Sequence, residues 1–215
     1  MKQAILVGGG PVSLKQLKQE LTIRPEILYA ADRGATYLLE LGVMPDLLVG
    51  DMDSFAESDL SRLAAAGVQI EKYPEAKNET DLELVVGQAL KAGALRIRIF
   101  GGLGGRFDHT LGNLGLLVNS LEHGVEAYLI DETHEITATS RDIVLTAKPG
   151  WAVSLIPWTN RVTGVTTTGL KFPLQNDTLY FSHTRGIHNQ FTAATARVTM
   201  KTGILLIVSF KEDQF

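Results

Sequence analysis

The stretch RIRIFGGLGGRFDHTLGNLGLLVNSLE, residues 96–122, contains the pattern that decides the fold. Its first part, Arg96–Phe100, predicts a short strand, and the apolar spacing over Thr110–Glu122 predicts a helix. Between them, four of the five residues from Gly101 to Gly105 are glycine. Such a turn lets backbone N–H groups approach an anion closely, and the dipole of the following helix favours negative charge there. We therefore expect a strand, a phosphate-binding turn and a helix in succession.

The same alternation of short apolar runs and amphipathic stretches continues from the start of the chain to about Asp131. We expect further strands near Ala4–Val7, Ile27–Ala31, Leu47–Val49, Val68–Lys72 and Ala127–Ile130. The expected helices are Ser13–Leu21, Ala35–Leu41, Glu57–Ala66, Asp81–Lys91 and Thr110–Glu122, several of them followed by glycine at Gly42, Gly67, Gly93 and Gly124. This pattern predicts an α/β domain, residues 1–131, with a mostly parallel sheet covered by helices.

Beyond Asp131 the helical periodicity disappears and β-branched runs replace it. We expect strands at Glu135–Thr139, Ile143–Ala147, Val153–Pro157, Arg161–Thr167, Thr178–Ser182, Ala194–Met200 and Ile204–Phe210. Because turn residues separate these short runs, a small antiparallel sandwich or barrel is expected over residues 134–215. The boundary between the two domains is predicted at Asp131–His134.

Composition narrows the classes of function. The chain has 215 residues, 45% of them apolar, a formal net charge of −4 and a pI near 5.7. This charge gives no long-range attraction for polyanions, so we expect no nucleic acid or membrane partner. There is no cysteine, which leaves oxygen atoms or histidine as metal ligands. The first residues lack the pattern of a signal peptide and no run is long enough to span a bilayer, so a cytoplasmic protein is expected.

The first acidic cluster is Gly50-Asp51-Met52-Asp53-Ser54, directly after the expected strand Leu47–Val49. Loops at the carboxyl ends of parallel strands are where open α/β sheets bind ligands. Asp51 and Asp53 would repel each other without a cation or water between them, and Mg²⁺ prefers such oxygen ligands. Ser54 with Glu57 also fits a helix capping box, so a metal site and a purely structural role both remain open.

The second cluster, Lys77 to Glu83, opens the helix expected at Asp81–Lys91. Thr80 and Glu83 fit a capping box, which explains both residues structurally. Asp81 and Lys77 are not explained by the cap. An aspartate in the first turn next to a lysine could hold a metal–phosphate pair, and it could equally belong to an ordinary capped helix.

The glycine turn continues into Arg106-Phe107-Asp108-His109. It matches neither the dinucleotide fingerprint G-x-G-x-x-G nor the P-loop, so both of those families are disfavoured. Arg106 can clamp phosphate oxygens in a fork. Asp108 could hold that arginine, a ribose or a metal-bound water, and His109 could be a base or a structural donor.

Two weaker signals follow the first and second strands, namely Gly8-Gly9-Gly10-Pro11 and Ala31-Asp32-Arg33-Gly34-Ala35. Each alone could be a tight turn or a helix cap. Together with the clusters above, they place glycine or aspartate after five strands, which is typical of residues that line a ligand crevice.

As a set, these motifs resemble the thiamine pyrophosphokinase family. The resemblance rests on Ala31 to Ala35, on Pro45-Asp46 leading into Gly50 to Ser54, on Lys77 to Glu83 and on Gly101 to His109 with Asn113-Leu114 following. In the second half, Gly169-Leu170-Lys171-Phe172-Pro173-Leu174 and Gly186-Ile187-His188-Asn189-Gln190-Phe191 are similar to the family's G-L-K-[WYF]-x-L and G-x-S-N-x-F segments. It therefore extends over nearly the whole chain.

The resemblance implies transfer of a pyrophosphoryl group from ATP to thiamine in a homodimer, with thiamine sites at the subunit interface. It implies that Mg²⁺ is the cofactor, held by Asp51, Asp53 and Asp81, and that Arg106 and Asp108 complete the catalytic set. The implied ATP-binding residues are Gly9, Asp32, Gly34, Lys77, Thr80, Gly102, Gly104, Gly105, Arg106 and His109. The implied thiamine-binding residues are Phe172, His188 and Asn189.

Three positions depart from the family pattern. Asn78 stands where an aspartate is frequent, which leaves one position of the metal site neutral and its role to Asp81. His188 replaces a serine, so the local hydrogen bonds to thiamine should differ. Arg33 stands where glycine is frequent.

Two other classes of function are compatible with the same crevice. One is a different Mg²⁺-dependent nucleotide pyrophosphoryl-transfer enzyme or hydrolase. The other is a non-catalytic nucleotide sensor whose β domain binds a protein, although three aspartates at strand ends argue against it. The fold alone does not choose between them, since α/β sheets carry many functions.

Overall fold

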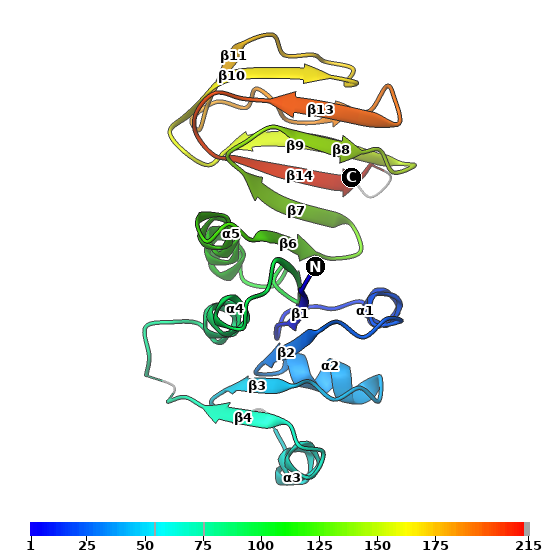
Figure 1. Ribbon diagram of the computed structural model, residues 1–215, viewed down its shortest axis with the longest axis vertical. Helices are drawn as coiled ribbons and strands as arrows, with labels where there is room; N and C mark the ends of the chain where they lie inside the picture. The colour runs from blue at the N-terminus through cyan, green and yellow to red at the C-terminus, as the bar shows by residue number, and fades with distance from the viewer. Residues whose placement is uncertain (54, 75, 213–215) are drawn as a thin grey trace. The chain divides into compact units, whose positions relative to one another are not determined.

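The computed structural model describes residues 1–53, 55–74 and 76–212, and the chain divides into two compact units (Figure 1). The first unit ends at Glu132 and the second begins at Thr133. The first combines helices with a parallel sheet and the second is antiparallel β structure. The predicted fold class is therefore confirmed.

The sheet of the first unit has the strand order β6, β5, β1, β2, β3, β4, and every neighbouring pair is parallel. Its strands are β1 (Gln3–Val7), β2 (Ile27–Ala31), β3 (Leu47–Gly50), β4 (Gln69–Lys72), β5 (Arg96–Phe100) and β6 (Glu126–Ile130). Because helices cover both faces, β1 and β2 carry nearly continuous apolar runs instead of an alternating pattern. All six strands lie within one residue of their predicted bounds.

The helices of this unit are α1 (Leu14–Glu20), α2 (Gly34–Glu40), α3 (Glu57–Ala65), α4 (Asp81–Lys91) and α5 (Phe107–Glu122). Figure 1 shows α1 and α2 on one side of the sheet and α4 and α5 on the other. Leu17, Leu38 and Leu63 belong to a buried cluster with Leu28 and Leu48 of the strands. This cluster fixes three helices against one face of the sheet by apolar burial.

Helix α5 begins at Phe107, three residues before the predicted start at Thr110. Gly105 has a positive φ of 71°, and Arg106 at the N-cap has extended backbone angles. The chain therefore turns sharply at the last glycine and enters the helix at once. As a result Arg106, Asp108 and His109 lie at the helix start beside the glycine turn.

The second unit contains two antiparallel sheets with the strand orders β12, β9, β14, β7 and β11, β10, β13, β8. The strands are β7 (His134–Thr139), β8 (Ile143–Thr146), β9 (Trp151–Pro157), β10 (Arg161–Thr168), β11 (Asp177–Tyr180), β12 (Asn189–Gln190), β13 (Thr195–Thr199) and β14 (Leu205–Lys211). Leu155 and Ile207 of one sheet share a buried cluster with Val162, Leu179 and Val198 of the other. Of the two predicted forms, sandwich or barrel, the structure has the sandwich, and β12 is a strand that the sequence analysis did not find.

In the described part of the chain, no helix has both the length and the apolar character needed to cross a membrane.

Gly34, the first residue of α2, lies against the carboxyl end of β1. A Cβ atom at this position would be 1.9 Å from the carbonyl oxygen of Val7 and 3.1 Å from the carbonyl carbon of Gly8. Both neighbours are backbone atoms, so they could not move aside without displacing the strand. Because residue 34 has no side chain, the first turn of α2 can pack directly against the backbone at the carboxyl end of β1.

We predict that Gly34→Ala lowers the free energy of unfolding by about 2–3 kcal/mol, because the added methyl group must displace backbone. The matched control is Gly115→Ala on α5, where a Cβ atom would meet no atom within 4 Å. That change should be neutral or raise stability by about 0.5–1 kcal/mol through helix propensity. Urea unfolding followed by circular dichroism measures both, and equal stability of the two variants would contradict the packing argument.

Candidate active site at the carboxyl edge of the parallel sheet

Two glycine turns meet at the carboxyl ends of the adjacent strands β1 and β5. The N–H of Gly8 donates to the carbonyl oxygen of Phe100 at 2.7 Å, and that of Gly10 donates to Gly101 at 3.0 Å. A Cβ atom on Gly10 would be 2.5 Å from the Gly101 oxygen. The two turns therefore pack backbone against backbone, with no space for a side chain between them.

A buried side-chain amide, that of Asn113, hydrogen bonds to the second glycine turn. Asn113 of α5 is 9% exposed, and its Nδ2 donates to the carbonyl oxygen of Gly102 at 2.8 Å. A Cβ on Gly102 would be 2.4 Å from the Leu129 side chain, so the turn also lies close on the strands. We assigned no role to Asn113 from sequence. The available signal was a polar residue three positions before buried Leu116 on the core-facing side of the helix.

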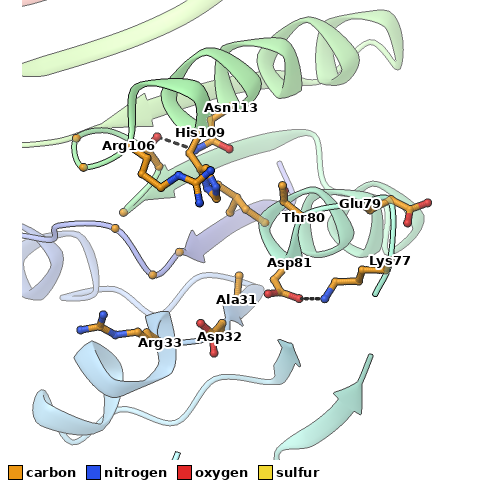
Figure 2. A pocket seen from close by; sticks show the side chains of 18 residues that line it. Ala31, Asp32, Arg33, Lys77, Glu79, Thr80, Asp81, Arg106, His109 and Asn113 are labelled. Carbon is orange, nitrogen blue, oxygen red and sulfur yellow. Dashed lines mark hydrogen bonds and ion pairs between the residues drawn. The ribbon is translucent and has the colours of Figure 1, made fainter. Parts of the chain in front are cut away.

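The turns form one wall of a cavity of about 380 Å³ (Figure 2). Its other walls come from the end of β2 and from the segment that leads into α4. Ten residues that the sequence analysis assigned to ATP or to catalysis line this cavity together, namely Gly9, Asp32, Lys77, Thr80, Asp81, Gly102, Gly104, Gly105, Arg106 and His109. Residues from four separate motifs therefore converge on a single space.

Four other predicted residues, Asp51, Asp53, Gly34 and Asp108, lie outside this lining. Asp108 lines an adjacent cavity of about 270 Å³, which also includes Thr80 and His109. Gly34 lies in the packing contact of α2 with β1 described above.

Asp51 and Asp53 belong to the turn after β3. The N–H of Asp53 donates to Oδ1 of Asp51 at 2.9 Å, and Met52 between them has a positive φ of 67°. The turn begins beside Asp32, since a Cβ on Gly50 would be 3.2 Å from the Asp32 Cα. Among the described residues, no three acidic or histidine side chains are close enough together to form a metal site. The three-aspartate Mg²⁺ site therefore stays a prediction.

The capping box considered for Ser54 and Glu57 includes Ser54, which lies outside the described residues. The N-cap of α3 is Ala56, which has no side-chain capping bond. Of the capping box predicted for α4, the bond to the Thr80 side chain is found, because Oγ1 of Thr80 accepts from the N–H of Glu83 at 3.1 Å.

An ion pair stands at the start of α4, where Nζ of Lys77 is 2.9 Å from Oδ1 of Asp81. The lysine side chain is 13% exposed and the aspartate 23%, so both are largely screened from solvent. That buried Oδ1 atom has no hydrogen-bond partner among the described residues, because the ammonium approaches it without hydrogen-bond geometry. Figure 2 shows Lys77 extending back to Asp81 along the cavity wall. Asp81 thus presents an acceptor that is neutralised but not hydrogen bonded.

A second ion pair lies at the start of α5. Nη2 of Arg106 is 2.5 Å from Oδ2 of Asp108, and Nε is 3.1 Å from Oδ1. The N–H of His109 also donates to Asp108, at 3.0 Å. The hydrogen bonds from Arg106, with smaller contributions from its charge and from the His109 N–H, lower the pKa of the Asp108 carboxyl to about 2. Of the roles considered for Asp108, holding Arg106 is the one present in this structure.

In the second unit, Asn189 joins the two predicted thiamine-binding segments. It is 5% exposed, its Oδ1 accepts from the N–H groups of Phe172 and Gln190, and its Nδ2 donates to the Phe172 carbonyl at 2.7 Å. Leu170 and Phe191 form a β-bridge beside it. Two segments separated in sequence are therefore fixed side by side by one amide.

Phe172 and His188 flank this junction. Phe172 is 59% exposed, so its ring is available at the surface and not part of the core. His188 has a positive φ of 55°, its N–H donates to Oγ of Ser154, and its Nε2 is 3.0 Å from Oε1 of Glu212. The residue that replaces the family's serine thus has a carboxylate partner in this chain.

The first unit has the features of one class of α/β proteins, those that bind a phosphorylated ligand at the carboxyl edge of a parallel sheet. Glycine N–H groups, Lys77 and Arg106 can meet phosphate oxygens, and Asp32 and Asp81 add carboxylates to the same space.

Comparison with known proteins identifies the family. Residues 19–129 match the catalytic domain of thiamin pyrophosphokinase, and residues 133–205 match its vitamin B1 binding domain. The thiamine pyrophosphokinase of Bacillus subtilis is 31% identical over 211 residues, which cover 97% of this chain and 98% of that protein. The chain belongs to the thiamine pyrophosphokinase family, as the motifs indicated.

Solved structures agree with this assignment. A crystal structure of thiamine pyrophosphokinase from Bacillus subtilis has a TM-score of 0.90 at 28% identity, covering 98% of this chain and 100% of that one. The structure from Geobacillus thermodenitrificans has a TM-score of 0.82 at 27% identity, with 97% of each chain covered. Family membership implies an ATP-dependent pyrophosphotransferase whose two domains suit ATP and thiamine as substrates.

We predict that Arg106→Gln raises the pKa of the Asp108 carboxyl from about 2 towards its ordinary value of 3.8. Because the folded-state pKa is the lower one, the stabilisation from this pair is present above pH 3.8 and is lost as the pH falls towards 2. NMR titration of the Asp108 carboxyl carbon in both proteins measures the shift. A wild-type carboxyl that titrates near 3.8 would refute the ion pair in solution.

We also predict that Asn189→Ala lowers the free energy of unfolding by about 1–3 kcal/mol, because it removes the hydrogen bonds that the buried amide makes with the partly buried backbone groups of Phe172. Asn160→Ala, at an exposed position of the same unit, is the matched control and should stay within about 0.5 kcal/mol of wild type. Chemical denaturation measures both. Equal midpoints and slopes for the two variants would show that the Asn189 amide does not fix these segments.

Proposed function

We propose that this chain transfers the β,γ-pyrophosphoryl group of ATP to the hydroxyl of thiamine and releases AMP and thiamine diphosphate. The observation that carries the proposal is the convergence of two glycine turns with Lys77, Asp81 and Arg106 around one cavity of about 380 Å³. Membership of the thiamine pyrophosphokinase family supports the same reaction. A cavity of this size is within the range of about 300–1,000 Å³ that is usual for small-molecule sites.

Charge and hydrogen bonding in the cavity suit a triphosphate. The N–H groups of Gly102, Gly104 and Gly105 supply donors without side chains in the way, and Arg106 and Lys77 supply positive charge. Gly9, Asp32, Thr80 and His109 complete the proposed ATP-binding set, and Gly34 contributes by setting the start of α2. Asp108 acts through Arg106, whose guanidinium it holds in a fixed orientation.

The carboxylates suit a Mg²⁺ ion. Oδ1 of Asp81 is buried and accepts no hydrogen bond from the described residues, so a hard cation could bind it in place of the Lys77 ammonium. Asp51 and Asp53 follow the neighbouring strand at the same edge of the sheet. We assign the ion to Asp51, Asp53 and Asp81. When bound, Mg²⁺ supplies positive charge against the phosphate oxygens.

The reaction is a displacement at phosphorus. The hydroxyl oxygen of thiamine forms a bond to the β-phosphorus while the bond from that phosphorus to the bridging α,β-oxygen breaks, and AMP leaves with this oxygen. The hydroxyl proton passes to a carboxylate, Asp81 or Asp53. Such transfer depends mainly on positioning and on charge stabilisation, so Arg106 and the glycine N–H groups supply what the phosphates need.

We assign thiamine to the second unit, at Phe172, His188 and Asn189. The exposed Phe172 ring can stack on an aromatic heterocycle, and the Nζ of Lys171 is 5.6 Å from the centre of that ring. Asn189 fixes the backbone on which Phe172 stands. The proposal includes a cytoplasmic homodimer with thiamine sites at the subunit interface, as the family resemblance implies.

We predict that Asp53→Asn lowers turnover at least about 100-fold without loss of folding, because it removes a charge from the proposed cation site. Asp59→Asn in the first turn of α3 is the matched control and should keep near-wild-type turnover. The assay supplies ATP, Mg²⁺ and thiamine and measures thiamine diphosphate and AMP. Near-normal activity of the Asp53 variant would refute the metal assignment.

The same assay separates the alternative functions. AMP and thiamine diphosphate in equal amounts, with AMP release dependent on thiamine, are the expected result. Hydrolysis of ATP without thiamine would support a nucleotide hydrolase. Binding of ATP without any product would support a sensor, and either outcome would overturn the proposed reaction.

A further inference from the structure

We infer that Lys77 occupies the carboxylate of Asp81 in place of the divalent cation until nucleotide binds, and that this exchange couples cation binding to nucleotide binding. The inference rests on the proposed function and deepens it, because it assigns Lys77 a role in the order of assembly of the site. In this inference Lys77 is a positioning residue, whose ammonium pairs with Asp81 before nucleotide binds and with phosphate oxygens afterwards.

The geometry of the pair carries the inference. Nζ of Lys77 is 2.9 Å from Oδ1 of Asp81, so the ammonium is in direct contact with this oxygen. The oxygen has less than 1 Å² of exposed surface, so there is no second open side from which a cation could approach it. A divalent ion that binds this oxygen must therefore displace the ammonium.

The position of Lys77 makes that displacement possible. It precedes α4 in a segment without regular structure, and among the described residues its Nζ also donates a 3.3 Å hydrogen bond to the carbonyl oxygen of Pro74. The four-carbon stem of lysine is flexible, in contrast to the planar fork of arginine. Since Lys77 lines the cavity together with the glycine turns, a triphosphate bound there gives its ammonium a new anionic partner.

Lys77 differs in this respect from the other cations of the cavity. Arg106 is paired with Asp108, which we do not assign as a metal ligand. Arg33 is exposed at the start of α2, at the opposite end of the view in Figure 2 from Lys77. Among the described lining residues, Lys77 is the cation that forms an ion pair with a proposed metal ligand, Asp81.

A coupling between the two ligands follows. Without nucleotide, a divalent cation must drive a largely buried ammonium out of its ion pair. With nucleotide present, that ammonium gains phosphate oxygens, so the same cation binds more tightly. By linkage the cation must raise the affinity for nucleotide by the same factor.

The test measures binding of Mn²⁺, as a spectroscopic substitute for Mg²⁺, by electron paramagnetic resonance, with and without a non-hydrolysable ATP analogue. We expect Lys77→Met to bind Mn²⁺ alone about tenfold more tightly than wild type, and its gain in Mn²⁺ affinity on adding nucleotide to fall about tenfold. Lys77→Arg keeps the charge and should remain close to wild type in the absence of nucleotide. Lys91→Met, in the last turn of α4, is the matched control and should change neither affinity.

Unchanged or weaker Mn²⁺ affinity in folded Lys77→Met, or an unchanged effect of nucleotide, would overturn the inference. So would a failure of every variant to bind Mn²⁺. Asp81→Asn should abolish the tight site, which verifies that the measured ion is the one that competes with Lys77. A chain that makes no thiamine diphosphate yet shows the expected Mn²⁺ behaviour would refute the proposed reaction and leave the exchange intact.

Discussion

The site depends on the contact between the two glycine turns, which hydrogen bond through their backbones at the ends of β1 and β5. Gly8 and Gly10 donate to Phe100 and Gly101, and a side chain at Gly10 or Gly101 would meet a carbonyl oxygen at 2.5 or 2.4 Å. Four glycines of the second turn, Gly101, Gly102, Gly104 and Gly105, line the cavity next to this contact. The glycines therefore serve packing, and the proposed phosphate-binding surface is built on that packing.

The architecture was predictable because its signals are local and periodic. Six apolar runs separated by helical spacing specify a parallel sheet, and the change to β-branched runs after Asp131 specifies antiparallel structure. The two elements that escaped prediction lack such a signal. Strand β12 has two residues, Asn189 and Gln190, too few to show alternation. The first turn of α5 was predicted as loop, because its sequence continues directly from the glycine turn. The backbone conformation of Gly105 determines that the helix begins at Phe107.

Ten of the residues that line the candidate cavity could be named from the sequence, whereas the contacts within the site could not. Residues that follow neighbouring parallel strands must share one edge of the sheet, so ten of the proposed ATP and catalytic residues could be placed together from their order alone. Asn113 and Asn189 were different. Each amide joins backbone groups that are 11 and 17 residues away in sequence, and such pairings are set by the packed fold. A side-chain amide on the apolar face of an element predicts that the amide will form a hydrogen bond, but the sequence does not show which backbone group is its partner.

The two ion pairs of the site explain how an anionic ligand can enter an acidic protein. Lys77 and Asp81 are four residues apart, and Arg106 and Asp108 are two apart, so each pair forms locally as its helix begins. The Arg106 pair is largely exposed, and exposed pairs contribute little to folding. Its arginine can therefore share a phosphate while it remains oriented by Asp108. The Lys77 pair is screened from solvent, so separating it requires a replacement for both charges. A cation for Asp81 and a phosphate for Lys77 supply that replacement together, and this is why the chemistry of the screened pair favours the joint binding of both ligands.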